Sequence, residues 1–149
     1  MKFREGDVRD LQDLMRIEQT CFGKQGFSRR LVEVLLLEED MSTIVVENVG
    51  EIVAYSMLFE EEKSWSTRII SIAVMPEHRG EGIAKALLQR MELLSRNKQA
   101  KKMTLEVGVV NVPAINLYLN FGFKIEGNVP DYYGQGKDAF YLEKRLVPS

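Results

Sequence analysis

The chain has 149 residues, 45% of them hydrophobic and 28% charged, which is the size and composition of one globular domain. Its formal net charge of −2 gives no basic footprint, so we expect no nucleic-acid partner. No apolar stretch follows the basic residues at the start, and no window reaches the length of a membrane span. We therefore expect a single cytoplasmic domain over residues 1–149, without a membrane partner.

Cysteine and histidine each occur once, as Cys21 and His78. A single cysteine excludes an internal disulfide, and the pair is too few for a Cys/His zinc site, so we expect no metal. Cys21 lies in an apolar pattern with Ile17 and Phe22, which favours a small core residue over a nucleophile.

The first part of the chain has helical spacing. Asp7 is a candidate cap for a helix whose apolar positions recur up to Cys21. The glycine-containing stretch 22–27 then breaks the helix, and Ser28 starts a second one that runs through Leu36. We expect two helices on either side of a loop.

Strand patterns dominate the middle of the chain. The runs 43–47 and 52–59 are rich in β-branched and apolar residues, and the segment 48–51 predicts a hairpin between them. A turn is expected at 60–63. The run 68–74 is nearly continuous in apolar residues, as expected of a strand covered on both faces.

The remainder alternates between helix and strand. A long helix has an apolar stripe formed by Ile83, Leu87, Leu88, Met91 and Leu94. A strand at 103–107 follows, and Asn111 caps a short helix that Gly122 ends. The segments 123–125 and 139–142 are the last strands. With a first strand before the two helices, this order predicts an α/β fold with a mixed sheet of about seven strands and helices on both faces.

The turn between the apolar strand and the long helix has the composition of a phosphate site. A pyrophosphate needs several backbone N–H groups at a helix N-terminus, and bulky side chains would block its approach. Gly80, Gly82 and Ala84 remove that bulk, while Arg79 and Lys85 flank the turn with positive charge. The alternative is a tight strand-to-helix connection without a ligand. The turn lacks the Gly-Lys-Ser/Thr end of a P-loop and the third glycine of a Rossmann turn.

This turn resembles the motif Arg/Gln-x-x-Gly-x-Gly/Ala of the GNAT acetyltransferases, which Arg79-x-x-Gly82-x-Ala84 meets. The preceding strand 72–78 is similar to that of the family, and its carboxy-terminal signature resembles Leu105-Glu106-Val107, Asn111, Ala114, Leu117-Tyr118 and Gly122-Phe123. Asp131-Tyr132-Tyr133 and Asp138-Ala139 further resemble the RimI-like N-terminal acetyltransferases, which act on ribosomal-protein and alanine N-termini.

The resemblance implies the GNAT fold, with a central twisted sheet and acetyl-CoA as the co-substrate. It places the pantetheine arm of the cofactor in a V-shaped opening between the strands 69–74 and 103–107. The cofactor-binding residues that it implies are Ile72, Ala73, Val74, Arg79, Gly80, Glu81, Gly82, Ile83, Ala84 and Asn111.

Glu106 is the candidate general base. An amine attacks a thioester only as the free base, and α-amino groups titrate near ~7.7–8.0 against ~10.4 for lysine. Glu106 lies between two apolar residues of a central strand, where a charge is costly unless it faces a cleft or a partner. An ion pair with Lys102 or Lys124 is the alternative, and the family resemblance favours the base.

Tyr118 is the candidate general acid for the leaving thiolate. Its spacing places it on one helix face with Ala114, Leu117 and Phe121, a pattern that favours a packed aromatic. The catalytic role is what the RimI-like resemblance implies. A main-chain amide near Val74 is expected to stabilise the oxyanion.

The resemblance implies a protein or peptide N-terminus as the acceptor, including ribosomal ones, and a groove for it formed by Phe22, Phe27, Tyr132 and Tyr133. Packing of the two tyrosines within their hairpin is the alternative. The sequence departs from its relatives at Gly108, where they usually carry arginine, and at Phe22-Gly23 in place of Phe-Pro.

Two other functions stay open. The acidic run Glu60–Glu62 suits a small polyamine acceptor, although such runs are usually solvated turns. A sensor that binds acetyl-CoA without turnover is the other, and the presence of both Glu106 and Tyr118 argues against it.

Overall fold

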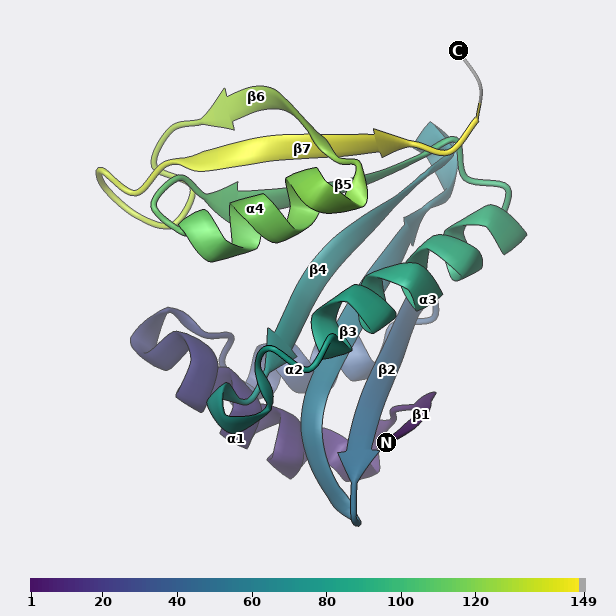
Figure 1. Ribbon diagram of the computed structural model, residues 1–149, viewed down its shortest axis with the longest axis vertical. Coiled ribbons are helices and arrows are strands. Elements are labelled where there is room, and N and C mark those ends of the chain that lie inside the picture. The colour runs from purple at the N-terminus through teal and green to yellow at the C-terminus, as the bar shows by residue number, and fades with distance from the viewer. Residues whose placement is uncertain (148–149) are drawn as a thin grey trace. The chain divides into compact units, whose positions relative to one another are not determined.

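The computed structural model describes residues 1–147 and contains one mixed sheet of seven strands (Figure 1). The strand order is β1-β2-β3-β4-β5-β7-β6, and β4 pairs with β5 in parallel. The strands are β1 (Lys2–Glu5), β2 (Met41–Asn48), β3 (Glu51–Glu61), β4 (Ser66–Val74), β5 (Lys102–Gly108), β6 (Lys124–Val129) and β7 (Ala139–Arg145). The helices are α1 (Leu11–Phe22), α2 (Arg29–Leu37), α3 (Ile83–Asn97) and α4 (Val112–Phe121). The predicted α/β fold is confirmed.

The chain divides into two compact units. The first consists of residues 1–59 and 69–89, and the second of 60–68 and the chain from Arg90 onward. The prediction of one domain over 1–149 stays a prediction. Within residues 1–147, no helix combines the length and apolar character that a membrane crossing requires.

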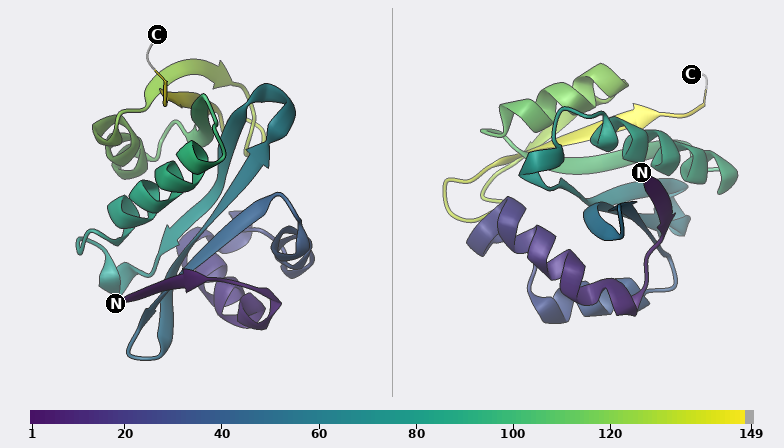
Figure 2. Two further views of the ribbon diagram at one scale, coloured as in Figure 1. Left: turned by 90° about the vertical axis from the view of Figure 1, so that its right-hand side faces the viewer. Right: turned by 60° about the horizontal axis from the view of Figure 1, so that its bottom comes forward.

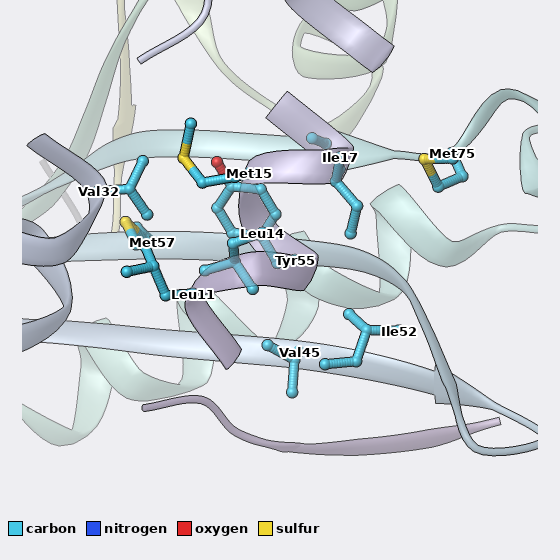
Figure 3. Close-up of a cluster of buried hydrophobic side chains, with 11 residues drawn as sticks. Leu11, Leu14, Met15, Ile17, Val32, Val45, Ile52, Tyr55, Met57 and Met75 are labelled. Atoms are coloured by element: carbon cyan, nitrogen blue, oxygen red, sulfur yellow. The ribbon is translucent and has the colours of Figure 1, made fainter. Parts of the chain in front are cut away.

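In the first unit, the strands are covered on both faces (Figures 1 and 2). Successive residues of β2 point to opposite sides, because side chains alternate along a strand. Val45 packs with the apolar faces of α1 and α2, whereas Val46 packs with Ile83 and Leu87 at the start of α3. Figure 3 shows the first cluster, formed by Leu11, Leu14, Met15, Ile17, Val32, Val45, Ile52, Tyr55, Met57, Ala73 and Met75.

In the second unit, β5 lies between β4 and β7. The parallel register pairs Ser66, Thr67 and Arg68 with Lys102, Met103 and Thr104. β7 pairs with β5 along its whole length and with β6 on its other edge, both antiparallel. α4 lies over β5 and β7 (Figures 1 and 2). β5 is therefore hydrogen-bonded along both of its edges, which fixes the faces of the sheet to which its side chains point.

Two predicted boundaries are wrong. Asp7 caps the 3₁₀ turn Val8–Asp10, and α1 begins only at Leu11. Asp10 causes this shift, because its buried carboxylate accepts hydrogen bonds from the Arg4 side chain and from the Asp7 amide. The turn expected at 60–63 is displaced as well, since β3 extends to Glu61.

The predicted hairpin at 48–51 is confirmed. Val49 and Gly50 form its two-residue turn, both with positive φ, 52° and 79°. Such a turn matches the right-handed twist of the two strands that it joins.

Candidate functional site

The turn between β4 and α3 has the backbone that the sequence predicts. Gly80 and Gly82 adopt φ values of 82° and 81°, a region that L-residues other than glycine enter only with strain. A Cβ atom at either position would meet no atom within 4 Å. The glycines therefore supply the conformation of the turn and leave open space above its backbone.

The amides of this turn lack acceptors. The first hydrogen bond of α3 runs from the Ala86 amide to the Gly82 carbonyl, at 3.0 Å. Within residues 1–147, no hydrogen-bond acceptor is found for the amides from Gly80 to Lys85. Unsatisfied N–H groups at a helix start carry partial positive charge and attract anions. The turn therefore fits a phosphate group.

Arg79 lies differently from its predicted position beside that phosphate. Its Nε donates to the Val74 carbonyl at 3.1 Å, and its Nη2 lies 3.6 Å from the Cys21 sulfur. The Cys21 thiol also donates to the Val74 carbonyl, at 3.4 Å. Val74 is one of the residues that the resemblance assigns to the cofactor, and its carbonyl is occupied here by two donors of the first unit.

The side chains at the end of β4 alternate between the two faces of the sheet. Ala73 faces the cluster under α1, whereas Ile72 and Val74 pack on the opposite face with Ile83. Cys21 packs against the first cluster as a partly buried side chain, and burial raises the pKa of its thiol. A thiol with a raised pKa is a weak nucleophile at neutral pH, so the prediction of a core cysteine agrees with its surroundings.

The predicted acceptor loop of the first unit leaves α1 at a glycine with positive φ. Phe22 is 39% exposed, while Phe27 packs against the cluster beneath α1. The Phe27 amide donates to the Glu18 carboxylate at 2.9 Å. One predicted aromatic is thus available at the surface, and the other anchors the loop.

In the second unit, Glu106 forms an ion pair with Arg68. Both Nε and Nη2 of Arg68 lie within 3.0 Å of the Glu106 Oε1 atom, and the Glu106 side chain is 13% exposed. The ion pair that was the alternative to the base is thus present, but its partner is Arg68 rather than Lys102, which binds Glu143 at 2.9 Å. The parallel register explains the partner: Arg68 lies opposite Thr104, two residues before Glu106 on the same face of β5.

Arg68 also binds one of the predicted acceptor residues. Its Nη2 donates to the Tyr132 hydroxyl at 2.8 Å, and the Tyr133 hydroxyl donates to the Glu106 carbonyl at 3.4 Å. Burial alone would lower the pKa of Arg68, but the Glu106 charge and Tyr132 raise it. The rings of the two tyrosines meet edge to face, with centroids 4.8 Å apart. The structure thus brings the predicted base and both predicted tyrosines together.

Gly108 lies under this group. A Cβ atom at position 108 would lie 3.7 Å from the Tyr133 ring, an ordinary van der Waals distance. Burial is the main cause that raises the Tyr133 pKa to about 12. The phenol that covers the end of β5 therefore stays neutral at working pH.

Tyr118 is buried in α4, with 7% of its surface exposed. Its ring meets Phe123 edge to face, with centroids 5.9 Å apart, so it packs as an aromatic core residue. Its hydroxyl has no hydrogen-bond partner in the part of the chain that the structure describes. Burial raises the pKa of this phenol, which keeps it protonated at neutral pH.

Asn111 caps α4 as predicted. Its Oδ1 accepts from the Ala114 amide at 3.3 Å.

No group of three or more metal-ligating side chains gathers within residues 1–147.

Comparison with known proteins identifies the family. The sequence model of the Acetyltransferase (GNAT) family matches residues 11–123. The chain belongs to the GNAT family. It is therefore an acetyl-transferring enzyme, as the resemblance of its motifs to this family predicts. An N-alpha-acetyltransferase of Sulfurisphaera tokodaii is 32% identical to this GNAT protein over 97% of the chain and 93% of the relative.

Solved GNAT structures share the fold. Ard1 from Thermoplasma volcanium superposes with a TM-score of 0.89 at 26% identity, over 99% of this chain and 98% of the other. The ribosomal-protein-S18-alanine N-acetyltransferase from Escherichia coli has the same TM-score at 20% identity, over 99% and 95% of the two chains. The seven-stranded GNAT fold is confirmed by these matches.

Sequence reasoning missed Arg68 and Glu18. The sequence nevertheless marks each of them as a charged residue in an apolar pattern. Arg68 begins the nearly continuous apolar run of the strand, and Glu18 lies four residues after Leu14 and three before Cys21, on the buried face of α1. Charged residues in such positions need a partner, but the partner depends on strand register and loop path.

Proposed function

We propose that this GNAT protein transfers the acetyl group of acetyl-CoA to the N-terminal α-amino group of a protein or peptide. The observation that carries the proposal is the network in the second unit, in which Arg68 joins the carboxylate of Glu106 to the hydroxyl of Tyr132. Proton acceptor and aromatic side chains meet at one end of β5, as an amine-binding site requires.

The proposed cofactor site is the glycine turn of the first unit. Its free amides, from Gly80 to Lys85, suit the pyrophosphate of coenzyme A, and the absence of side-chain bulk at Gly82 permits a close approach. Arg79 and the carbonyl of Val74 bind each other in this structure. Binding of the pantetheine arm at Val74 therefore requires Arg79 to leave, and its guanidinium is then free for a phosphate.

The proton chemistry is assigned to the second unit. The amine nitrogen forms a bond to the thioester carbonyl carbon, and the bond from that carbon to sulfur breaks. Glu106 takes the proton that the amine loses, directly or through a water molecule. Tyr118 holds its proton at neutral pH and donates toward the leaving thiolate.

The proposed acceptor is a polypeptide N-terminus, and the names of the relatives support it. The relative from Sulfurisphaera tokodaii is an N-alpha-acetyltransferase, and the structural neighbour from Escherichia coli acts on a ribosomal-protein alanine. The polyamine alternative loses support, because Glu60 of the acidic run forms a salt bridge with Lys98 at 3.0 Å. Half-exposed aromatics, rather than a set of free carboxylates, surround the proposed base.

A matched peptide panel tests the proposal. Peptides with a free N-terminus are compared with the same sequences blocked at the N-terminus and carrying one internal lysine, and spermidine completes the panel. Mass spectrometry after incubation with acetyl-CoA is expected to find acetylation only of the free N-termini. Acetylation of spermidine alone would assign a small-amine enzyme, and acetyl-CoA binding without any product would assign the sensor.

A further inference from the structure

Glu18 is a buried carboxylate that the proposed mechanism does not use. It is 2% exposed, on α1, and no lysine, arginine or histidine of residues 1–147 forms a salt bridge with it. A charge in such a place is costly unless hydrogen bonds replace its lost water. Glu18 therefore needs hydrogen-bond donors among its neighbours.

Three neutral donors of the first unit satisfy this carboxylate. Oε1 accepts from the Tyr55 hydroxyl of β3 and, at 3.1 Å, from the Ser71 hydroxyl of β4. Oε2 accepts from the Phe27 amide at 2.9 Å. One oxygen thus faces the sheet and the other faces the loop between α1 and α2. Figure 3 shows Tyr55 within the cluster beneath α1.

The loop depends on this contact. Within residues 1–147, the Glu18 carboxylate provides the only side-chain hydrogen bond from outside the loop to the segment Phe22–Phe27. Gly26 fits closely against the same residue, since a Cβ atom there would lie 3.1 Å from both the carbonyl oxygen and Oε2 of Glu18. The path of the loop is therefore set by Glu18.

We infer that Glu18 is a positioning residue for acceptor binding, which holds the loop Phe22–Phe27 in the conformation that receives the polypeptide N-terminus. The inference rests on the proposed function. Tyr55 and Ser71 both donate to Oε1, so either hydroxyl alone holds it against the sheet, while Oε2 accepts from the Phe27 amide. Phe27 in turn packs on the cluster, while Phe22 stays available to the acceptor.

The variants Glu18→Gln and Tyr55→Phe separate positioning from stability. Glutamine has one acceptor oxygen, so its NH₂ group must face either the Phe27 amide or the Tyr55 and Ser71 hydroxyls. Tyr55→Phe removes a donor on the sheet side and keeps the bond to the Phe27 amide. We expect Glu18→Gln to raise the KM for the peptide about tenfold, the equivalent of about one hydrogen bond, with the Kd for acetyl-CoA unchanged. Tyr55→Phe is expected to lower the Tm while the KM stays within about twofold of wild type.

Gly26→Ala provides a second variant that leaves the carboxylate in place. The added methyl group forces the loop away from Glu18, so the peptide KM is expected to rise as in Glu18→Gln. Hydrogen exchange of the Phe27 amide, measured without substrate, is expected to be faster in both variants and unchanged in Tyr55→Phe. An unchanged peptide KM in both Glu18→Gln and Gly26→Ala, or an equal rise in Tyr55→Phe, overturns the inference alone. Failure of the wild-type enzyme to acetylate any free N-terminus overturns the proposed function, and this inference with it.

Discussion

Glu18 and Glu106 are two carboxylates that are largely withdrawn from water, one in each unit, and their partners differ in kind. Glu18 is held by two hydroxyls and one amide, all neutral, and is 2% exposed. Glu106 is held by the guanidinium of Arg68, whose side chain is 34% exposed. The first carboxylate is enclosed within a core, while the second meets a charge at the surface of its unit.

This difference agrees with the roles that we propose for the two side chains, positioning for Glu18 and proton transfer for Glu106. Neutral donors on three segments fix Glu18 in one position, and only 2% of its surface is exposed. Arg68 compensates the charge of Glu106 and is accessible enough for a second cation, such as a protonated amine, to compete for the carboxylate. We therefore expect variants around Glu106 to change turnover, and variants of the first unit to change binding and stability.

The largest expected effect is that of Glu106→Gln. The amide cannot accept the amine proton, so kcat is expected to fall about 10²–10⁴-fold while the Kd for acetyl-CoA is unchanged. Steady-state kinetics with a free N-terminal peptide, together with calorimetric binding of acetyl-CoA, measure the two quantities.

Glu143→Gln is the matched control for this variant. Glu143 lies on the neighbouring strand β7, with its side chain 19% exposed, and pairs with Lys102 rather than with Arg68. Its loss is expected to leave kcat within about twofold of wild type, because surface ion pairs contribute little. Equal kcat values for wild type and Glu106→Gln would remove Glu106 from the role of base.

The second prediction concerns the glycine turn of the first unit. Gly82→Ala places a residue at φ 81°, which costs about 1–2 kcal/mol in a left-handed conformation, and puts a methyl group into the open space above the turn. The Kd for acetyl-CoA is expected to rise at least about tenfold, since the methyl group obstructs the phosphate.

Gly50→Ala controls for the backbone strain. Gly50 has φ 79° and open space around its Cβ position, but it lies in the hairpin between β2 and β3. Both variants are expected to unfold at a lower temperature than wild type, and only Gly82→Ala is expected to lose acetyl-CoA affinity. An equal loss of affinity in both would assign the effect to stability.

The same two carboxylates show which features of the fold and of the candidate site the sequence can predict. Apolar periodicity predicts the helices and strands, and the run from Arg79 to Ala84 predicts the turn, because both depend on neighbours in the chain. The partner of Glu106 depends on which residue of β4 lies opposite β5, and a parallel register leaves no local mark in the sequence. Lys102, four residues away along the strand, is therefore the obvious partner and the wrong one.

Glu18 illustrates the same limit on a helix. Its spacing from Leu14 and Cys21 places it on the buried face, so a partner is required. Two of its three donors come from strands far along the chain and the third from a loop amide, whose direction follows from the loop's path rather than from residue type. The sequence predicts the presence of such a site but not its members.

The smallest effect that we expect is a change in alkaline stability from Tyr55→Phe. Burial, together with the neighbouring Glu18 charge, raises the pKa of Tyr55 far above its ordinary value near ~10, so the folded protein keeps this phenol neutral where the unfolded chain ionises. A raised pKa contributes stability that is fully present below the unfolded value and is lost as the pH rises beyond it.

Between pH 10 and 11, the free energy of unfolding is therefore expected to fall more steeply with pH in wild type than in Tyr55→Phe. The difference in slope is at most about 1.4 kcal/mol per pH unit, the value for one proton. Urea unfolding at pH 8, 10 and 11 measures this difference in slope. Ser71→Ala serves as the control, since it removes another donor to Glu18 but keeps the phenol, and it is expected to follow the wild-type slope. Parallel curves for wild type and Tyr55→Phe would mean that the phenol ionises in the folded state as it does in the unfolded chain, and that the enclosure of Glu18 does not extend to its partner Tyr55.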